Sequence, residues 1–268
     1  MLDLDVADLL ATYDAQLRAQ VPDRLPEGVR VEHDGPLLRF VGDGPRGFVG
    51  YRDLGGLDGP ELDELIARQV RIFAERDEPF EWKLHAHDRP ADLAERLRAA
   101  GFVPEDVETV VIAPVAAVAV DASVPDGVTL REVHERVDLD RIARMLEVIW
   151  KKEQGWLADS IERERAADPE GLTIVVAEHD DMVVCAGWMR FPRGTEFATL
   201  WGGGTLPGWR GRGIYRALVS YRAKLAAQRG LRYLQVDASG ESRPILERLG
   251  FVAVTTTTPF VWSPPVVA

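Results

Sequence analysis

The chain repeats one order of elements in its two halves, and this repeat limits the folds that it can adopt. A helix, a Gly-Phe pair and a strand close the first half at LRAAGF (97–102), and the same signal closes the second half at LERLGF (246–251). Helical and strand-like patterns precede both matches in the same order. The repeat predicts a duplicated α/β (α+β) fold made of two similar halves.

A segment flanked by Pro and Gly divides the two halves. PVAAVAVDASVPDG (114–127) consists of small residues and has no helical period. We therefore expect a first half at 1–117, a linker at 118–127 and a second half at 128–268. The main expected helices are 5–19, 61–78, 139–151 and 157–167, and the main expected strands are 37–41, 48–52, 80–87, 107–114 and 128–133.

Charge and cysteine content narrow the partners and the compartment. The net charge of −12 repels the phosphate backbone of nucleic acids and favours cationic partners. Cys185 is the single cysteine, so no intramolecular disulfide can form and a cytoplasmic location is expected. The start MLDLDVADLL lacks the basic and apolar regions of a signal peptide. No apolar run reaches the roughly 20 residues that a membrane span needs.

The stretch RGRGI (210–214) opens a helix directly after a strand and predicts an anion site. Gly211 and Gly213 leave backbone N–H groups open to a ligand, and the start of a helix adds partial positive charge. No Lys-Ser or Lys-Thr follows, so this is not a P-loop. A dinucleotide fingerprint would place a third glycine where Arg216 stands. The pattern favours a pyrophosphate.

Glycines in the preceding strand suggest a second part of the same ligand site. Trp201 is followed by Gly202, Gly203 and Gly204, and such a run marks a bulge or a close backbone approach. If this strand diverges from its neighbour LQVDAS (234–239), its free amides and carbonyls can pair with an amide-bearing arm. A pyrophosphate joined to such an arm is coenzyme A.

At this point the chain resembles the GNAT acetyltransferase superfamily, over about residues 126–262. Arg210 to Gly213 resemble its R/Q-x-x-G-x-G/A signature, TLP (205–207) resembles its V-x-P, and the final GF is shared. The resemblance implies an acetyl-CoA-dependent N-acetyltransferase with mixed, mostly antiparallel sheets flanked by helices and with splayed strands in the second half. It implies cofactor contacts at Gly203, Gly204, Thr205, Leu206, Arg210, Gly211, Arg212, Gly213, Ile214, Tyr215 and Arg216.

Three positions depart from the family pattern. Tyr215 stands where the signature has a small residue, and Leu246 stands where many members have the tyrosine that protonates the departing thiolate. Ser239 occupies the place of a common asparagine. Because the usual acid is replaced, a catalytically impaired acyl-CoA-binding regulatory protein is the alternative function.

The first half resembles a degenerate copy, as in tandem members of the family. The counterpart of RGRG is LGGLDGPELDE (54–64), which is acidic and would repel a phosphate. We therefore expect one acetyl-CoA site in each chain, in the second half.

Acetyl transfer to an amine needs a base, because the ammonium form cannot attack a thioester. Its deprotonation at pH 7 costs about 4 kcal/mol. Asp237, at the end of the strand that should splay, and Glu196, before strand FATLW, are the candidates, with a helix or turn cap and an exposed loop charge as their respective alternatives. Ser239 is a candidate proton donor through water, or a cap of the last helix.

The acceptor is expected to be a primary amine of a small molecule or peptide, with a cationic character. Trp150, Glu153, Trp156 and Trp201 are the candidate substrate contacts, because aromatic rings and a carboxylate can hold an ammonium group. Core packing is the alternative role for the tryptophans. His85 and His87 lack an evident third ligand, so no metal is expected. The sequence fits a monomer or a homodimer.

Overall fold

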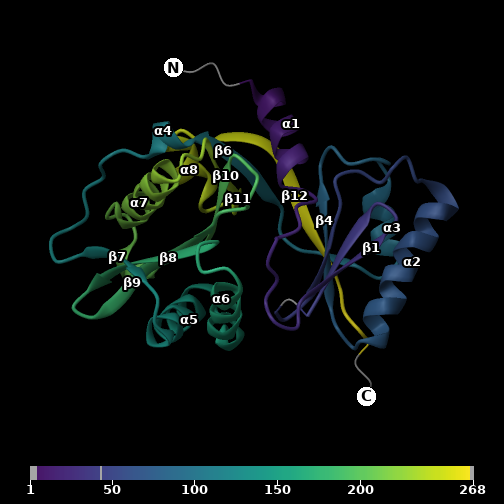
Figure 1. The fold of residues 1–268 in the computed structure, drawn as a ribbon, viewed down its shortest axis with the longest axis horizontal. Helices are drawn as coiled ribbons and strands as arrows, with labels where there is room; N and C mark the ends of the chain where they lie inside the picture. The colour runs from purple at the N-terminus through teal and green to yellow at the C-terminus, as the bar shows by residue number, and fades with distance from the viewer. Residues whose placement is uncertain (1–4, 43, 266–268) are drawn as a thin grey trace.

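The computed structural model describes residues 5–42 and 44–265 and has two lobes joined by long strands (Figure 1). The first half contains α1 (Val6–Gln16), β1 (Arg30–Asp34), β2 (Leu37–Val41), β3 (Gly47–Gly50), α2 (Gly59–Glu75), β4 (Phe80–His85), α3 (Leu93–Ala99), β5 (Val103–Pro104), β6 (Glu108–Pro114) and α4 (Val115–Val118).

The second half begins with a strand and two helices and then repeats the order of three strands, a helix, a strand, a helix and a closing strand. It contains β7 (Thr129–Val133), α5 (Arg136–Trp150), α6 (Gly155–Ala167), β8 (Leu172–His179), β9 (Met182–Arg190), β10 (Phe197–Thr205), the short 3-10 helix Pro207–Trp209, α7 (Ile214–Gln228), β11 (Tyr233–Ala238), α8 (Arg243–Arg248) and β12 (Val252–Trp262).

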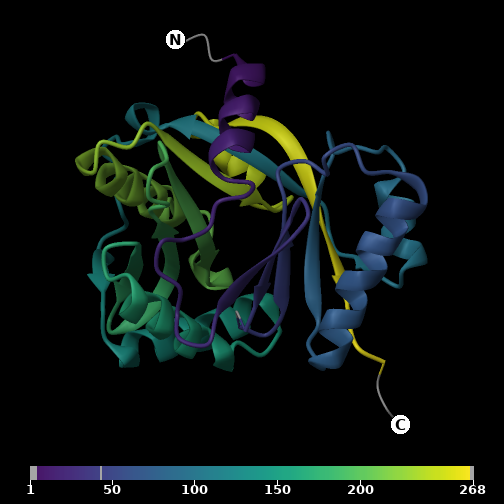
Figure 2. The same ribbon diagram turned by 45° about the vertical axis from the view of Figure 1, so that its right-hand side comes forward.

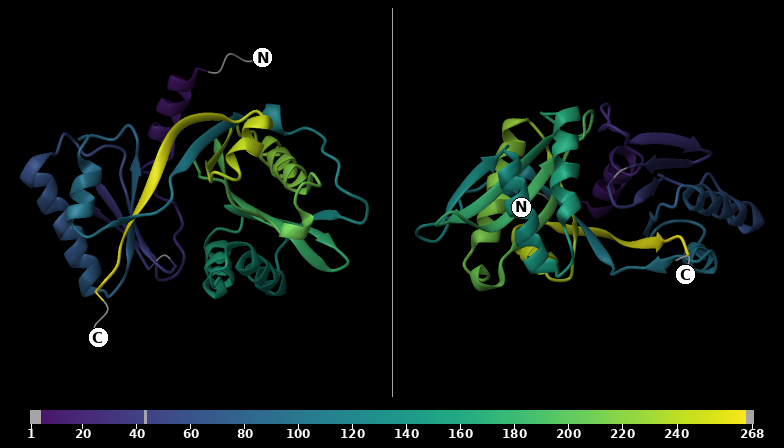
Figure 3. Two further views of the ribbon diagram at one scale, coloured as in Figure 1. Left: turned by 180° about the vertical axis from the view of Figure 1, so that it is seen from behind. Right: turned by 90° about the horizontal axis from the view of Figure 1, so that it is seen from below.

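The two halves exchange their last strands and so share one sheet. The strand order is β1-β2-β3-β4-β12-β6-β11-β10-β9-β8-β7, with β5 on β12. Thus β6 of the first half lies between β12 and β11, while β12 of the second half runs antiparallel to β4. Figures 2 and 3 show β12 crossing from one lobe to the other. The repeat predicted the duplicated α/β fold, but not this exchange.

Helices cover the sheet because each has one apolar stripe. In α2, Leu62, Leu65, Ile66 and Phe73 recur at helical spacing and are buried against β4 and β12 residues such as Phe80. Burying each such side chain contributes about 1.5–3 kcal/mol. In the second half, α5 and α6 pack on one face of the sheet, and α7 and α8 pack on the other (Figure 1).

Helix α1 belongs to the first half in sequence but packs on strands on both sides of the exchange. Leu9 and Tyr13 lie in one apolar cluster with Val110 and Ile112 of β6 and Phe197 of β10. Helix α1 also contacts β12. Helix α1 therefore covers the place where the two lobes join.

Most expected elements are present, with bounds shifted by up to three residues, and the short strands β1 and β5 and the helix α4 are additional. The segment predicted to start the linker begins with the short helix α4, whose Val115 and Val118 are buried against α7 and neighbouring residues. Strand β1 (Arg30–Asp34) was not predicted, because RVEHD is polar and its side chains are half-buried or exposed.

Candidate functional site

The loop before α7 has the backbone geometry of an anion nest. Gly211 and Gly213 have φ angles of +74° and +81°, and Gly213 is the N-cap of α7. No side chain caps this helix, so its first N–H groups lack a partner from a capping side chain. A Cβ built at Gly211 meets nothing within 4 Å, so the loop is open on that side.

Arginine side chains lie around the N-terminus of α7. The guanidinium of Arg212 lies over the ring of Trp209, 4.8 Å from its centroid, and Trp209 packs against His179. Arg210 donates from Nε to the carbonyl oxygen of Thr205 at 3.2 Å, and an exposed Glu241 lies 3.8 Å from its Nη1. Sequence reasoning missed Trp209, although its position directly before RGRG marks it.

Strands β10 and β11 diverge at the glycine run. They pair in parallel only from Phe197–Tyr233 to Thr199–Gln235, although β10 continues to Thr205 and β11 to Ala238. A bulge between Trp201 and Gly204 interrupts the pairing of β10 with β9. The expected splayed strands are therefore present in the second half.

The glycines of this bulge are required by close neighbours. A Cβ at Gly202 would lie 1.9 Å from Cζ3 of Trp188, and Gly202 has a φ of +60°. A Cβ at Gly203 would lie 2.8 Å from Cε2 of Tyr215. The bulky Tyr215 thus fills space that Gly203 leaves open. Burial raises the pKa of the Tyr215 phenol.

The positions that depart from the family pattern have packing or turn contacts. Leu246 is fully buried in the apolar cluster beneath α7 and α8. Ser239 accepts a hydrogen bond from the backbone N–H of Ser242 at 3.3 Å, and the two hydroxyls lie 3.2 Å apart. Ser239 therefore stabilises the turn into α8, as a capping residue does.

Asp237 lies at the splayed end of β11 and is fully paired. Its Oδ2 accepts from Nζ of Lys83 at 2.6 Å, and its Oδ1 accepts from Nε2 of Gln235 at 2.8 Å. Lys83 comes from β4 of the first half. Burial alone would lower the pKa of Lys83, but Asp237, Glu81 and Glu108 raise it overall.

Glu196 lies at the other end of β10 from the glycine run. Five residues of strand separate it from Trp201, which is about 17 Å. It accepts from Nε2 of Gln16 at 3.0 Å and pairs with Arg232, and these two contacts lower the pKa of its carboxyl. The structure does not bring Glu196 and Asp237 together.

A cleft of about 800 Å³ lies between the two lobes on the α5 and α6 side of the sheet. It brings together three of the candidate acceptor contacts, Glu153, Trp156 and Trp201; Trp150 is not among its lining residues in the described chain. The guanidinium of Arg190 lies 4.8 Å from the ring centroid of Trp201. Further lining residues include Phe40, Phe48, Arg46, Glu81, Glu105 and Trp188.

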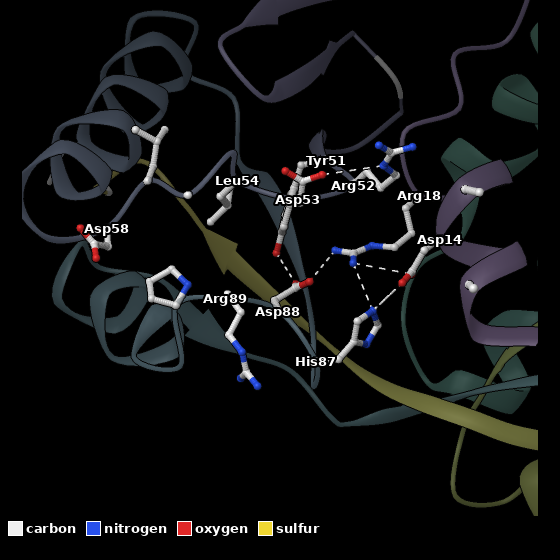
Figure 4. Close-up of a pocket in the computed structure, with 15 residues that line it drawn as sticks. Asp14, Arg18, Tyr51, Arg52, Asp53, Leu54, Asp58, His87, Asp88 and Arg89 are labelled. Atoms are coloured by element: carbon white, nitrogen blue, oxygen red, sulfur yellow. Dashed lines mark hydrogen bonds and ion pairs between the residues drawn. The ribbon is translucent and has the colours of Figure 1, made fainter. Parts of the chain in front are cut away.

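The first half has a pocket of about 550 Å³ at the position that corresponds to the loop before α7 (Figure 4). It lies between the segment after β3 and the end of β4, beside α2. Its floor is a network of paired charges: Asp88 accepts from Arg18 at 2.7 Å and from the Tyr51 hydroxyl at 2.6 Å. Asp53 and Asp58 line this pocket, and Asp58 is the N-cap of α2, as Gly213 is the N-cap of α7.

Within 5–42 and 44–265, no group of three or more His, Cys, Asp or Glu side chains has an arrangement that could hold a metal ion. In the described part of the chain, no helix is both long and apolar enough to cross a membrane.

Comparisons with known proteins agree with this geometry. Residues 139–251 match the acetyltransferase (GNAT) family. A GCN5-related N-acetyltransferase from Kribbella flavida is similar in structure, with a TM-score of 0.65, 17% identity, and coverage of 97% of this chain and 94% of that chain. One from Sphaerobacter thermophilus has a TM-score of 0.63, 14% identity, and coverage of 98% and 87%.

A tandem GNAT protein from the clavulanic acid biosynthesis pathway is also similar, with a TM-score of 0.63, 13% identity, and coverage of 91% of this chain and 86% of that chain. At such identities the likeness concerns the fold. A search of curated protein sequences gave no match.

Proposed function

We propose, since the chain belongs to the GNAT superfamily, that it is an acetyl-CoA-dependent N-acetyltransferase acting on a primary amine of a small molecule or peptide. One observation carries the proposal. The open, glycine-rich start of α7 and the bulged end of β10 lie on consecutive segments beside the point where β10 and β11 diverge.

The loop residues suit the pyrophosphate of acetyl-CoA. The backbone N–H groups at Gly211, Gly213 and the start of α7 offer donors, and Arg210, Arg212 and Arg216 offer positive charge. The bulged residues Gly203 to Leu206 offer backbone groups to the amide-bearing arm, because β10 no longer pairs with β11 there. The loop before α2 in the first half places Asp53 and Asp58 at its pocket, and these carboxylates would repel a phosphate, so we propose one site in each chain.

The cleft between the lobes suits a cationic acceptor. Trp156 and Trp201 supply aromatic faces, and Glu81, Glu105 and Glu153 supply negative charge. Part of that charge is neutralised, because Arg46 pairs with Glu81 at 2.6 Å and with Glu105 at 3.0 Å. An ammonium group on a ligand with an apolar body fits this combination.

The reaction joins the two sites by direct attack. The acceptor ammonium loses a proton, its nitrogen lone pair attacks the thioester carbonyl carbon, the C–S bond breaks, and the thiolate of coenzyme A leaves. The acylated nitrogen then gives its second proton to that thiolate or to solvent. Holding both substrates at the splayed strands supplies much of the rate, because the reacting atoms are already aligned. A thiol has an ordinary pKa near 8.5, so the thiolate needs little help from an acid. This accommodates Leu246 in place of the usual tyrosine.

A regulatory protein that binds acyl-CoA without turnover is the second candidate. The buried Leu246 and the turn role of Ser239 favour it, because neither of these positions offers a free proton donor at the thioester. Both functions use the same cofactor loop. Only turnover separates them.

A thiol-release assay with acetyl-CoA and an amine library tests the proposal. The library should contain polyamines, aminoglycosides, amino acids and N-terminal peptides. We expect release of coenzyme A with at least one amine above the rate of thioester hydrolysis. Binding of acetyl-CoA without release with any amine would support the regulatory alternative, and absence of binding would refute both.

A further inference from the structure

A row of charged side chains connects the cleft between the lobes with the splayed end of β11. Glu81 lines the cleft, and Lys83 lies two residues further along β4. Phe80 and Trp82 point into the core of the first half, so Glu81 and Lys83 face the second half. Nζ of Lys83 lies 2.6 Å from Oδ2 of Asp237 and 3.8 Å from Oε2 of Glu108.

The two carboxylates at this lysine differ in their availability. Both oxygens of Asp237 accept short hydrogen bonds, and its side chain is 12% exposed. The side chain of Glu108 is 33% exposed, and its contact with Lys83 is longer. Among the described residues, no hydrogen-bond donor within the usual distance reaches the Glu108 carboxylate. Glu108 therefore has a free oxygen for a ligand or a water molecule.

The strand exchange places Glu108 beside the region where the thioester is proposed to lie. Ala238 of β11 pairs with Thr109 of β6, and Glu108 is the next residue along β6. This pairing lies three residues beyond the last contact of β11 with β10, at Gln235. A residue of the first half thus stands at the open end of the splayed strands.

The surroundings of Glu108 raise its pKa, so that both its carboxylate and its carboxylic acid form are present near pH 7. Burial raises the pKa of its carboxyl to about 7, Lys83 opposes this rise, and the negative charges of Asp237, Glu81 and Glu105 add to it. His85, the nearest titratable group on β4 beyond Lys83, stays neutral because burial and the charges of Arg18 and Lys83 lower its pKa to about 2. Tyr13 of α1 is neutral as well, since burial raises its pKa.

We propose that Glu108, rather than Asp237, accepts the proton of the acceptor ammonium, and that Lys83 and Asp237 are positioning residues. This inference rests on the proposed acetyl transfer. The Glu108 carboxylate takes one proton from R–NH₃⁺, directly or through one water, which leaves R–NH₂ to attack the thioester. The acylated nitrogen gives its second proton to the departing thiolate. The products are the N-acetyl amine, the free thiol of coenzyme A and protonated Glu108, which then returns its proton to solvent.

The kinetic test compares Glu108→Gln with Asp106→Asn. Asp106 is an exposed carboxylate two residues away, so its variant controls for the loss of one negative charge. We expect Glu108→Gln to lower kcat/KM by about 10²-fold or more and to remove the acidic limb of the pH–rate profile, while acetyl-CoA affinity stays within about two-fold. Asp106→Asn should keep the wild-type kcat/KM and the acidic limb of the pH–rate profile. An unchanged limb in Glu108→Gln, or its loss in Asp237→Asn alone, would overturn the inference.

A second measurement separates this inference from the proposed function. The glutamate side-chain carboxyls are titrated by carbon NMR in the intact protein, and the resonance missing in Glu108→Gln assigns Glu108. We expect an apparent pKa near 7. A value near the ordinary 4.3 would overturn the inference even if the protein acetylates amines. A protein without turnover would refute the proposed function, and the titration would still decide the state of Glu108.

Discussion

Replacing Gly202 by alanine tests whether the bulge in β10 depends on a bare backbone. The new Cβ would lie 1.9 Å from Cζ3 of the Trp188 ring, which is far too close for two carbon atoms that are not bonded to each other. Overpacking of this kind costs about 1–3 kcal/mol. The φ of +60° at Gly202 adds about 1–2 kcal/mol for a residue with a side chain. We therefore expect Gly202→Ala to lose about 2–5 kcal/mol of unfolding free energy.

Thermal and denaturant unfolding measure this loss. It corresponds to a fall in Tm of roughly 10 °C, at about 2–4 °C per kcal/mol for chains of this size. Gly208→Ala is the matched control, because a Cβ there meets nothing within 4 Å. We expect it to change stability by less than about 0.5 kcal/mol. If the bulge flattens to avoid the clash, acetyl-CoA affinity falls instead of stability.

A double-mutant cycle with Trp188→Leu isolates the clash. The single change Trp188→Leu removes a buried ring and destabilises by itself. In that background Gly202→Ala should cost only the backbone strain of about 1–2 kcal/mol. The reasoning is refuted if Gly202→Ala keeps both wild-type stability and wild-type acetyl-CoA affinity, or if Trp188→Leu leaves its cost unchanged.

Three further outcomes are expected. Gly213→Asp should abolish acetyl-CoA binding in calorimetry, because it puts a carboxylate into the anion nest. The control Gly59→Asp changes the start of α2 in the first half, and it should bind one equivalent of acetyl-CoA as the wild type does. A truncated chain of residues 120–268 should be insoluble or unfolded, because it lacks β6; a monodisperse, fully active product would contradict this. Raising salt should raise the KM of a cationic acceptor and leave kcat nearly constant, and a KM indifferent to ionic strength would argue against a charged acceptor.

The local parts of the site could be predicted from the sequence because their signals are local. Gly211 and Gly213 predict left-handed backbone at a helix start, and the glycine run after Trp201 predicts a bulge. Neither prediction depends on distant parts of the chain. Tyr215 was recognised as a departure from the family pattern. The packing of the Tyr215 ring against Gly203 could not be predicted, because that contact depends on how α7 crosses β10.

The contacts between the halves could not be predicted, because they arise from the choice of strand partners. VETVVIAP and VAVTTTTPFVW both read as buried strands after a Gly-Phe pair, and nothing in either pattern says which sheet each one joins. The strand exchange decides which sheet each strand joins, and it also brings Lys83 of β4 close to Asp237 of β11. Asp237 was proposed as a base from its place on β11, whereas Glu108 drew no attention because it begins a strand of the half that lacks the cofactor loop.

Under the proposed function, the exchange gives the first half a role without a cofactor of its own. Its loop at 54–64 is acidic and its pocket holds paired charges, so its contribution to the proposed acetyl transfer would come through shared structure. Strand β6 fills the place next to β11, where Val110, Val111 and Ile112 are fully buried, and the second half cannot bury its splayed strand without them. The same strand begins at Glu108, which lies at the open end of the splayed strands. Selection for a closed sheet and selection for a proton acceptor would therefore act on one segment, and loss of the first half would remove both.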